Sequence, residues 1–115
     1  MKTPNEALEL MEVAKNKAYS CGKNYVNAKA EYLKHDSLKK IFFANIVSQQ
    51  EGKSFKEKEN LALLSGEWKG FVEALVDLEI NRDKWRLEQD RWIKEWETCR
   101  SILSALKQEL RTLGG

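Results

Sequence analysis

The sequence predicts an all-α protein, a long antiparallel helical hairpin of the coiled-coil type that self-associates. Apolar side chains recur at alternating spacings of three and four residues over 61–113, and a softer series of the same kind covers 11–46. This spacing averages 3.5 residues per turn, which is the heptad repeat of a left-handed coiled coil. The only proline is Pro4, and 33% of the 115 residues are charged, which is typical of long exposed helices.

The expected organisation is one helical-hairpin domain over residues 1–115, with a helix over about 4–47, a turn over 48–54 and a second helix over about 55–113. Thr3 or Asn5 caps the first helix, with Pro4 in its first turn. Gly22 lies inside this helix at a cost of about 1 kcal/mol relative to Ala, and we interpret it as a tolerated interruption or mild kink. The heptad series of the first helix is Met11, Ala14, Ala18, Cys21, Tyr25, Ala28, Tyr32, His35, Lys39, Phe42 and Ile46.

The turn follows from residues that end one helix and begin the next. Gly52 suits a left-handed cap, and Ser54 with Glu57 three residues later matches a capping box. Such a short connection makes the two helices antiparallel neighbours. If the turn centres near residues 50–51, Trp68 faces the region of Tyr32, and Arg82 lies near Ala18.

The second helix carries the stronger seam, in which thirteen of sixteen positions are large apolar groups. These positions are Leu61, Leu64, Trp68, Phe71, Leu75, Leu78, Arg82, Trp85, Gln89, Trp92, Trp96, Cys99, Leu103, Leu106, Leu110 and Leu113. The small residues of the first seam leave room for these large side chains.

Self-association follows from the lengths of the two helices. With this register the first helix covers the second only as far as Trp96, so the apolar stripe over residues 99–113 has no partner within the chain. Apolar residues off the seam widen the surface: Val72, Val76, Ile80, Leu87 and Ile93. The expected oligomer interface is Trp92, Trp96, Cys99, Leu103, Leu106, Leu110 and Leu113. The order, from dimer to ring, stays open, as does an open hairpin that exchanges helices between subunits.

Enzymatic chemistry has little support in the sequence. The single histidine, His35, falls on the first seam, where a packed or partly exposed imidazole is expected. Cys21 and Cys99 lie about twenty helical residues apart in the hairpin, too far for a shared metal or a disulfide. Glycine-rich phosphate loops and nucleophile elbows do not occur. We therefore expect a non-enzyme with no metal and no cofactor.

Localisation follows from two further absences. The longest uncharged run, residues 41–50, is too short to span a bilayer, and the N-terminus does not match a signal peptide. The expectation is a cytoplasmic protein that contacts no membrane.

Charge is unevenly distributed and suggests a nucleic-acid surface. Residues 13–50 hold seven lysines against Glu31 and Asp36, whereas residues 51–115 are nearly balanced. The candidate phosphate-binding residues are Lys15, Lys23, Lys29, Lys34, Lys39 and Lys40. A solvated helix face is the alternative. Residues 83–96 interleave tryptophan with basic groups, as single-strand binders do, but these tryptophans fall on the seam and are better explained as core or oligomer contacts.

Several segments resemble small helical bacteriophage proteins encoded near replication and recombination genes. They are residues 32–34, Lys39-Lys40 before an apolar turn, residues 56–62 followed by Ser65, and residues 96–101. Residues 32–40, followed by a late aromatic helix, also resemble the UvsY-type recombination mediators, which are helical oligomers that bind single-stranded DNA and help to load a recombinase. The second half, in which acidic residues offset the basic ones, departs from that pattern.

Two functional hypotheses result. The first is a phage accessory protein of DNA recombination or replication, a homo-oligomer in the host cytoplasm that binds single-stranded DNA together with a recombinase or another replication protein. The second is a protein-only adaptor, assembly factor or inhibitor that docks a host or phage protein through its helical surface.

Overall fold

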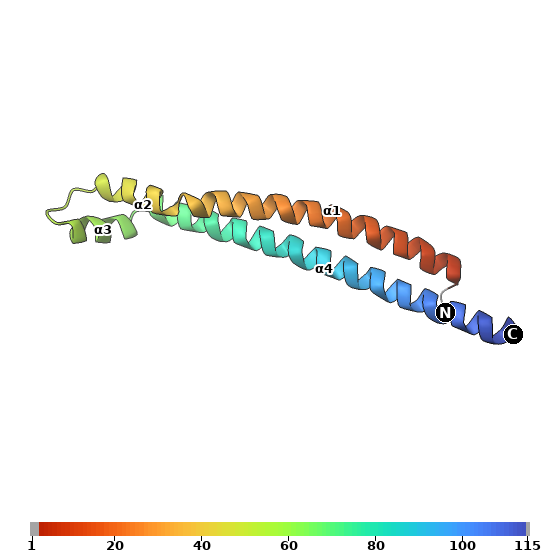
Figure 1. The fold of residues 1–115 in the computed structure, drawn as a ribbon. Coiled ribbons are helices and arrows are strands. Elements are labelled where there is room, and N and C mark those ends of the chain that lie inside the picture. The colour runs from red at the N-terminus through yellow and green to blue at the C-terminus, as the bar shows by residue number, and fades with distance from the viewer. Residues whose placement is uncertain (1–2, 115) are drawn as a thin grey trace. The chain divides into compact units, whose positions relative to one another are not determined.

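The computed structural model describes residues 3–114, which form α-helices with no strand among them (Figure 1). The helices are α1 (Pro4–Ser37), α2 (Lys39–Ser48), α3 (Phe55–Leu63) and α4 (Gly66–Gly114). The predicted all-α hairpin is confirmed.

The chain divides into two compact units, and α1 and α4 each contribute to both. The terminal unit contains the described residues up to Tyr25 and those from Lys84 onward, and the turn unit contains residues 26–83. Within each unit a part of α1 runs antiparallel to a part of α4 (Figure 1).

Helix α1 begins as the sequence predicts. The Thr3 hydroxyl accepts a hydrogen bond from the Glu6 backbone N–H at 3.2 Å, so Thr3 is the cap and Pro4 opens the helix. The helix ends at Ser37, whose hydroxyl donates to the Lys34 carbonyl at 2.7 Å. Leu38 then bonds three residues back instead of four, which separates α1 from α2.

The turn keeps its predicted cap but not its predicted glycine geometry. Ser54 has extended backbone angles and accepts from the Glu57 N–H at 3.2 Å, while the Glu57 carboxylate accepts from the Lys53 N–H at 2.9 Å. No glycine in residues 3–114 has a positive φ, so the left-handed cap expected at Gly52 is wrong. A Cβ on Gly52 would lie 3.0 Å from Lys58 Cγ and 3.2 Å from Glu57 Cβ, so a larger residue here would have to displace its neighbours by a few tenths of an ångström.

A second break separates α3 from α4 within the segment expected to be one helix. The Ser65 hydroxyl donates to the Ala62 carbonyl at 2.7 Å and accepts from the Trp68 N–H at 3.2 Å. Ser65 is therefore the cap of α4.

Most of the predicted seams is buried, but Leu61 and Leu64, the first two positions of the second seam, are 43% and 71% exposed. Every seam position of α4 from Trp68 to Leu106 is buried or half-buried, and in the first seam only Lys39 is exposed. The buried apolar residues of the terminal unit are Ala7, Ala14, Cys21 and Cys99, and those of the turn unit are Ala28, Ile46, Val47, Ala62, Phe71 and Leu75. Small residues of the first seam thus alternate with large half-buried ones, as expected.

The register differs from the prediction by roughly three helical turns. In the turn unit the Arg82 guanidinium lies 4.5 Å from the centre of the Tyr32 ring, not near Ala18, and Trp68 packs on Phe43 at 4.8 Å. The chain does reverse at residues 49–54, as predicted, but the shift is already present beside the turn. Ala62 of α3 packs with Ile46 and Val47 of α2, whereas a turn centred at residues 50–51 would place it opposite residue 39.

This register corrects the expected end of helix coverage. Cys99 is 0% exposed, so it is enclosed within the chain and presents no surface to a second subunit. Leu103 and Leu106 are half-buried, whereas Leu110 and Leu113 are 63% and 86% exposed. The unpartnered stripe is therefore shorter than predicted.

Candidate nucleic-acid interface

All six candidate phosphate-binding lysines are exposed. They are Lys15, Lys23, Lys29, Lys34 and, at the start of α2, Lys39 and Lys40. Within residues 3–114 none of them pairs with a carboxylate; the ion pairs of Arg82 and Arg91 lie on α4. Lys23 lies over the Tyr19 ring, 5.5 Å from its centre. Their ammonium groups are therefore accessible to an anion.

An aromatic cluster lies beside two of these lysines in the turn unit. The rings of His35 and Phe42 both stack on Phe71, with centroids 4.1 and 4.5 Å away. Trp68 stacks on Phe71 at 5.7 Å and is tilted against Phe43 at 4.8 Å. His35 Nε2 also lies 3.3 Å from the Phe71 carbonyl oxygen. The histidine is therefore packed, as its seam position predicts.

The aromatic cluster packs on the hydrophobic core of the turn unit. Ile46, Val47 and Ala62 are buried together, and Phe43 and Trp68 pack against them. Because α2 supplies the first two and α3 supplies Ala62, the core fixes α2 and α3 as neighbours. It thereby fixes the positions of the side chains that these helices carry.

A cavity of about 300 Å³ opens at this point, lined by Lys39, Lys40, Phe43, Leu63 and Trp68. The two lysines come from the first turn of α2, and Leu63 is the last residue of α3. Trp68 lies in the first turn of α4, where its backbone N–H bonds to Ser65. Three apolar walls and two cationic side chains thus converge from three helices.

This combination suits an anion that carries a flat apolar group. Aromatic rings stack on nucleobases of any sequence, and lysine ammonium groups attract the neighbouring phosphates. The volume is at the lower end of the range typical of small-molecule pockets. Phe43, Leu63 and Trp68 were not among the predicted site residues.

A smaller cavity of the terminal unit repeats part of this chemistry. Lys15, Ala18, Ile93 and Trp96 line a space of about 150 Å³. Lysine again borders a tryptophan and an aliphatic side chain. The space is half the size of the cavity in the turn unit, and it has one lysine where that cavity has two.

The three tryptophans of residues 83–96 are half-buried on the seam. Each carries a cation of its own helix over its ring: Lys84 over Trp85 at 4.9 Å, Arg91 over Trp92 at 5.0 Å and Arg100 over Trp96 at 5.4 Å. These cations occupy ring faces that a nucleobase would need. The arrangement favours the structural interpretation of these residues over base stacking.

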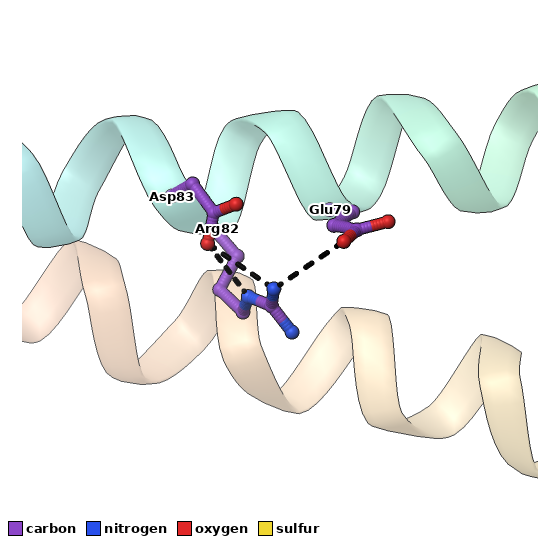
Figure 2. A network of polar contacts seen from close by, with 3 residues as sticks. All are labelled: Glu79, Arg82 and Asp83. Atoms are coloured by element: carbon purple, nitrogen blue, oxygen red, sulfur yellow. Dashed lines mark hydrogen bonds and ion pairs between the residues drawn. The ribbon is translucent and has the colours of Figure 1, made fainter.

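Arg82 is the charged residue of the second seam, and its neighbours hold it in place (Figure 2). Its Nε donates to Asp83 Oδ1 at 3.1 Å, and its terminal nitrogen lies 3.8 Å from a Glu79 oxygen. The guanidinium covers the Tyr32 ring. The hydrogen bond to Asp83 raises the pKa of Arg82 above its ordinary value. Arg82 is thus a contact within the turn unit and not an accessible phosphate ligand.

Both cysteines lie in the terminal unit, buried and unbonded. Gly22, next to Cys21, lies against Gln89, which is ten residues before Cys99 in α4. The two thiols are therefore separated by about 15 Å along the helices, which is closer than expected but still too far for a disulfide.

The predicted oligomer residues divide into two groups. Cys99 is enclosed, and Trp92, Trp96, Leu103 and Leu106 are half-buried; Leu110 and Leu113 are exposed. Of the seven, only Leu110 and Leu113 expose most of their surface.

Within residues 3–114 no three of His, Cys, Asp and Glu gather where they could hold a metal ion, and no helix combines the length and apolarity needed to cross a membrane. Comparison with protein families, with curated proteins and with solved structures found no match to this chain.

Proposed function

We propose that this chain is a non-enzymatic, oligomeric coiled-coil accessory protein that binds single-stranded DNA in phage DNA recombination or replication. The observation that carries the proposal is the set of six exposed lysines on α1 and α2, none of which pairs with a carboxylate within residues 3–114. Unpaired surface lysines release counterions from phosphates when they bind a strand.

The distribution of charge supports a DNA-binding surface on the first half of the chain. Lysines outnumber acidic residues seven to two over residues 13–50. The ion pairs of Arg82 and Arg91 lie instead on α4, which supports DNA contact by α1 and α2.

Self-association would strengthen a surface whose individual contacts are weak. Each lysine contributes one phosphate contact, so a single hairpin binds a strand weakly. An assembly that repeats the surface binds one strand at several points, and its avidity exceeds the affinity of one hairpin. The proposed working state is therefore a homo-oligomer in the host cytoplasm, with a recombinase or another replication protein as its partner.

Absence of catalysis is part of the proposal. The side chain best suited to proton transfer near neutral pH is His35, and its ring stacks on Phe71 within the hairpin. That contact supports a packing role for the histidine.

The test is fluorescence anisotropy of a labelled oligothymidine of about twenty nucleotides at low and high salt. For three phosphate contacts per hairpin, affinity falls about 20-fold between 50 and 200 mM salt, because single strands follow a slope of about −0.7 per contact. The triple variant Lys34→Glu, Lys39→Glu, Lys40→Glu is expected to abolish binding with its helix content unchanged.

A matched control separates this surface from total charge. Lys56→Glu, Lys94→Glu and Lys107→Glu together change the net charge equally at exposed positions outside the lysine set. This control is expected to retain most of the binding. A flat titration of the unmodified protein at both salt concentrations would exclude the DNA function.

A protein-only adaptor, assembly factor or inhibitor is the second candidate, favoured by apolar side chains exposed off the seams. In the turn unit these include Val26, Leu33, Ile41, Val76 and Ile80. A helical partner buries such residues without counterion release. Binding of a phage or host protein that withstands high salt, with no DNA binding, would select this function.

A further inference from the structure

We propose that the cavity between α2, α3 and α4 holds one nucleobase of a bound single strand, with Lys39 and Lys40 on the phosphates beside it. The proposal rests on the DNA-binding function above and assigns that function to a place in the fold. It is distinct from a general lysine surface because it requires the base as well as the backbone.

The walls of the cavity are suited to a flat apolar group. Phe43 and Trp68 contribute aromatic surface, and Leu63 forms the aliphatic side. Phe43 and Trp68 are half-buried and pack on the core of the turn unit, so their positions are set before any ligand arrives. A preformed apolar cavity binds a base at a lower entropic cost than a flexible surface does.

The charges of the cavity come from adjacent residues. Lys39 and Lys40 both line the space, both are exposed, and neither pairs with a carboxylate within residues 3–114. A nucleotide strand presents phosphates on both sides of each base, which matches two cations beside one apolar slot.

A nucleotide fits these features better than an acidic peptide does. A peptide supplies negative charge, but its carboxylates need no aromatic wall. The Trp68 ring already stacks on Phe71 and is tilted against Phe43, so a base would contact the aromatic surface that Trp68 and Phe43 leave toward the cavity. Every nucleobase has a π-face for such a contact. The peptide is therefore the competing outcome of the test.

Two neighbouring leucines provide a matched pair of variants. Leu63 lines the cavity and is 51% exposed, while Leu64 is 71% exposed and lies outside it. Leu63→Glu places a carboxylate in the lining that Leu63 shares with Lys39 and Lys40, and Leu64→Glu adds the same charge one residue away. Because both side chains are largely exposed, both variants are expected to fold, and circular dichroism checks their helix content.

The experiment is anisotropy of labelled oligothymidine, and of an abasic oligomer of equal length, titrated with each protein at low salt. The unmodified protein is expected to prefer the base-carrying strand by about fivefold or more, the ratio that corresponds to one stacked base. Leu63→Glu is expected to weaken oligothymidine binding by about tenfold and to lose the preference. Leu64→Glu is expected to keep the preference and to change affinity by less than about threefold.

Three results overturn the proposal in distinguishable ways. If the unmodified protein binds neither strand, the DNA function fails together with this site. If it binds both strands equally, or if the two leucine variants behave alike, DNA binding survives and the base site is wrong. If an alternating Asp-Leu peptide binds with the same dependence on Leu63 while the abasic strand binds as well as oligothymidine, the cavity is a peptide site.

Discussion

At the scale of single residues, two glycines of similar appearance have different surroundings. A Cβ on Gly22 in the terminal unit would lie 2.6 Å from the amide nitrogen of Gln89, whereas a Cβ on Gly70 would meet nothing within 4 Å. The absence of a side chain at Gly22 therefore makes room for Gln89, a seam residue of α4. At Gly70 the space that a side chain would take is open. Neither has a positive φ, so conformational freedom explains neither glycine.

Alanine substitution should separate these two roles. Gly70→Ala is expected to raise the free energy of unfolding by about 0.5–1 kcal/mol, because glycine costs that much in a helix interior. Gly22→Ala is expected to raise the free energy of unfolding by less, because the Gln89 amide must turn away to make room for the new methyl group. Chemical denaturation at one fixed protein concentration measures both variants, because the proposed self-association would make apparent stability depend on concentration.

A double variant checks the cause. In a Gln89→Ala background, Gly22→Ala is expected to raise the free energy of unfolding about as much as Gly70→Ala does, because the obstructing amide is gone. An equal gain for Gly22→Ala in both backgrounds would contradict the contact between Gly22 and Gln89.

At the scale of helices, the break between α3 and α4 determines where the cavity forms. Ser65 ends one helix and caps the next, which brings Trp68 into the first turn of α4. Without this break the segment would continue as the single helix that the heptad pattern predicts.

Loss of the Ser65 cap is expected to destabilise the protein. Ser65→Ala removes the bond that satisfies the Trp68 N–H, and replacement of such a cap typically costs about 1 kcal/mol. Ser101→Ala is the control, since Ser101 is exposed within α4. The measurement is the denaturant concentration at the unfolding midpoint of each variant. Equal midpoints would show that the cap contributes nothing to stability.

The same helices show what the sequence predicts well and what it does not. Periodicity identified the residues that face inward, because burial of one stripe is a property of each helix alone. Periodicity did not determine the register, because an apolar stripe that recurs at every turn can face a partner stripe after a shift of several helical turns. The serine-glycine pair at residues 65–66 was the available signal for the break.

The candidate site was predictable only in part for a related reason. Lys39 and Lys40 were identified from charge, which is visible along the chain. Phe43, Leu63 and Trp68 join them only when three helices are placed together, and Leu63 faces the cavity because α3 ends there. A seam position for Trp68 indicated packing, and the structure shows that packing and cavity lining coincide in one side chain.

At the scale of the whole molecule, the proposed association between chains needs apolar surface that the fold leaves uncovered. Cys99 is enclosed in the terminal unit, while Leu110 and Leu113 remain largely exposed near the end of α4. The proposed contact between copies is therefore narrower than the seven residues that the heptad pattern suggests, and it centres on these two leucines.

Replacement of the two leucines tests this contact. Leu110→Asp with Leu113→Asp is expected to lower the native mass measured by sedimentation, because two carboxylates cannot be buried at an apolar interface without a large desolvation cost. Gln108→Asp with Thr112→Asp adds the same charge at exposed positions off the seam and is expected to leave the mass unchanged. If the unmodified protein sediments as a monomer, the proposed self-association is wrong. If it sediments as an oligomer and the leucine variant keeps that mass, the contact lies elsewhere, and the exposed apolar residues of the turn unit become the next surface to substitute.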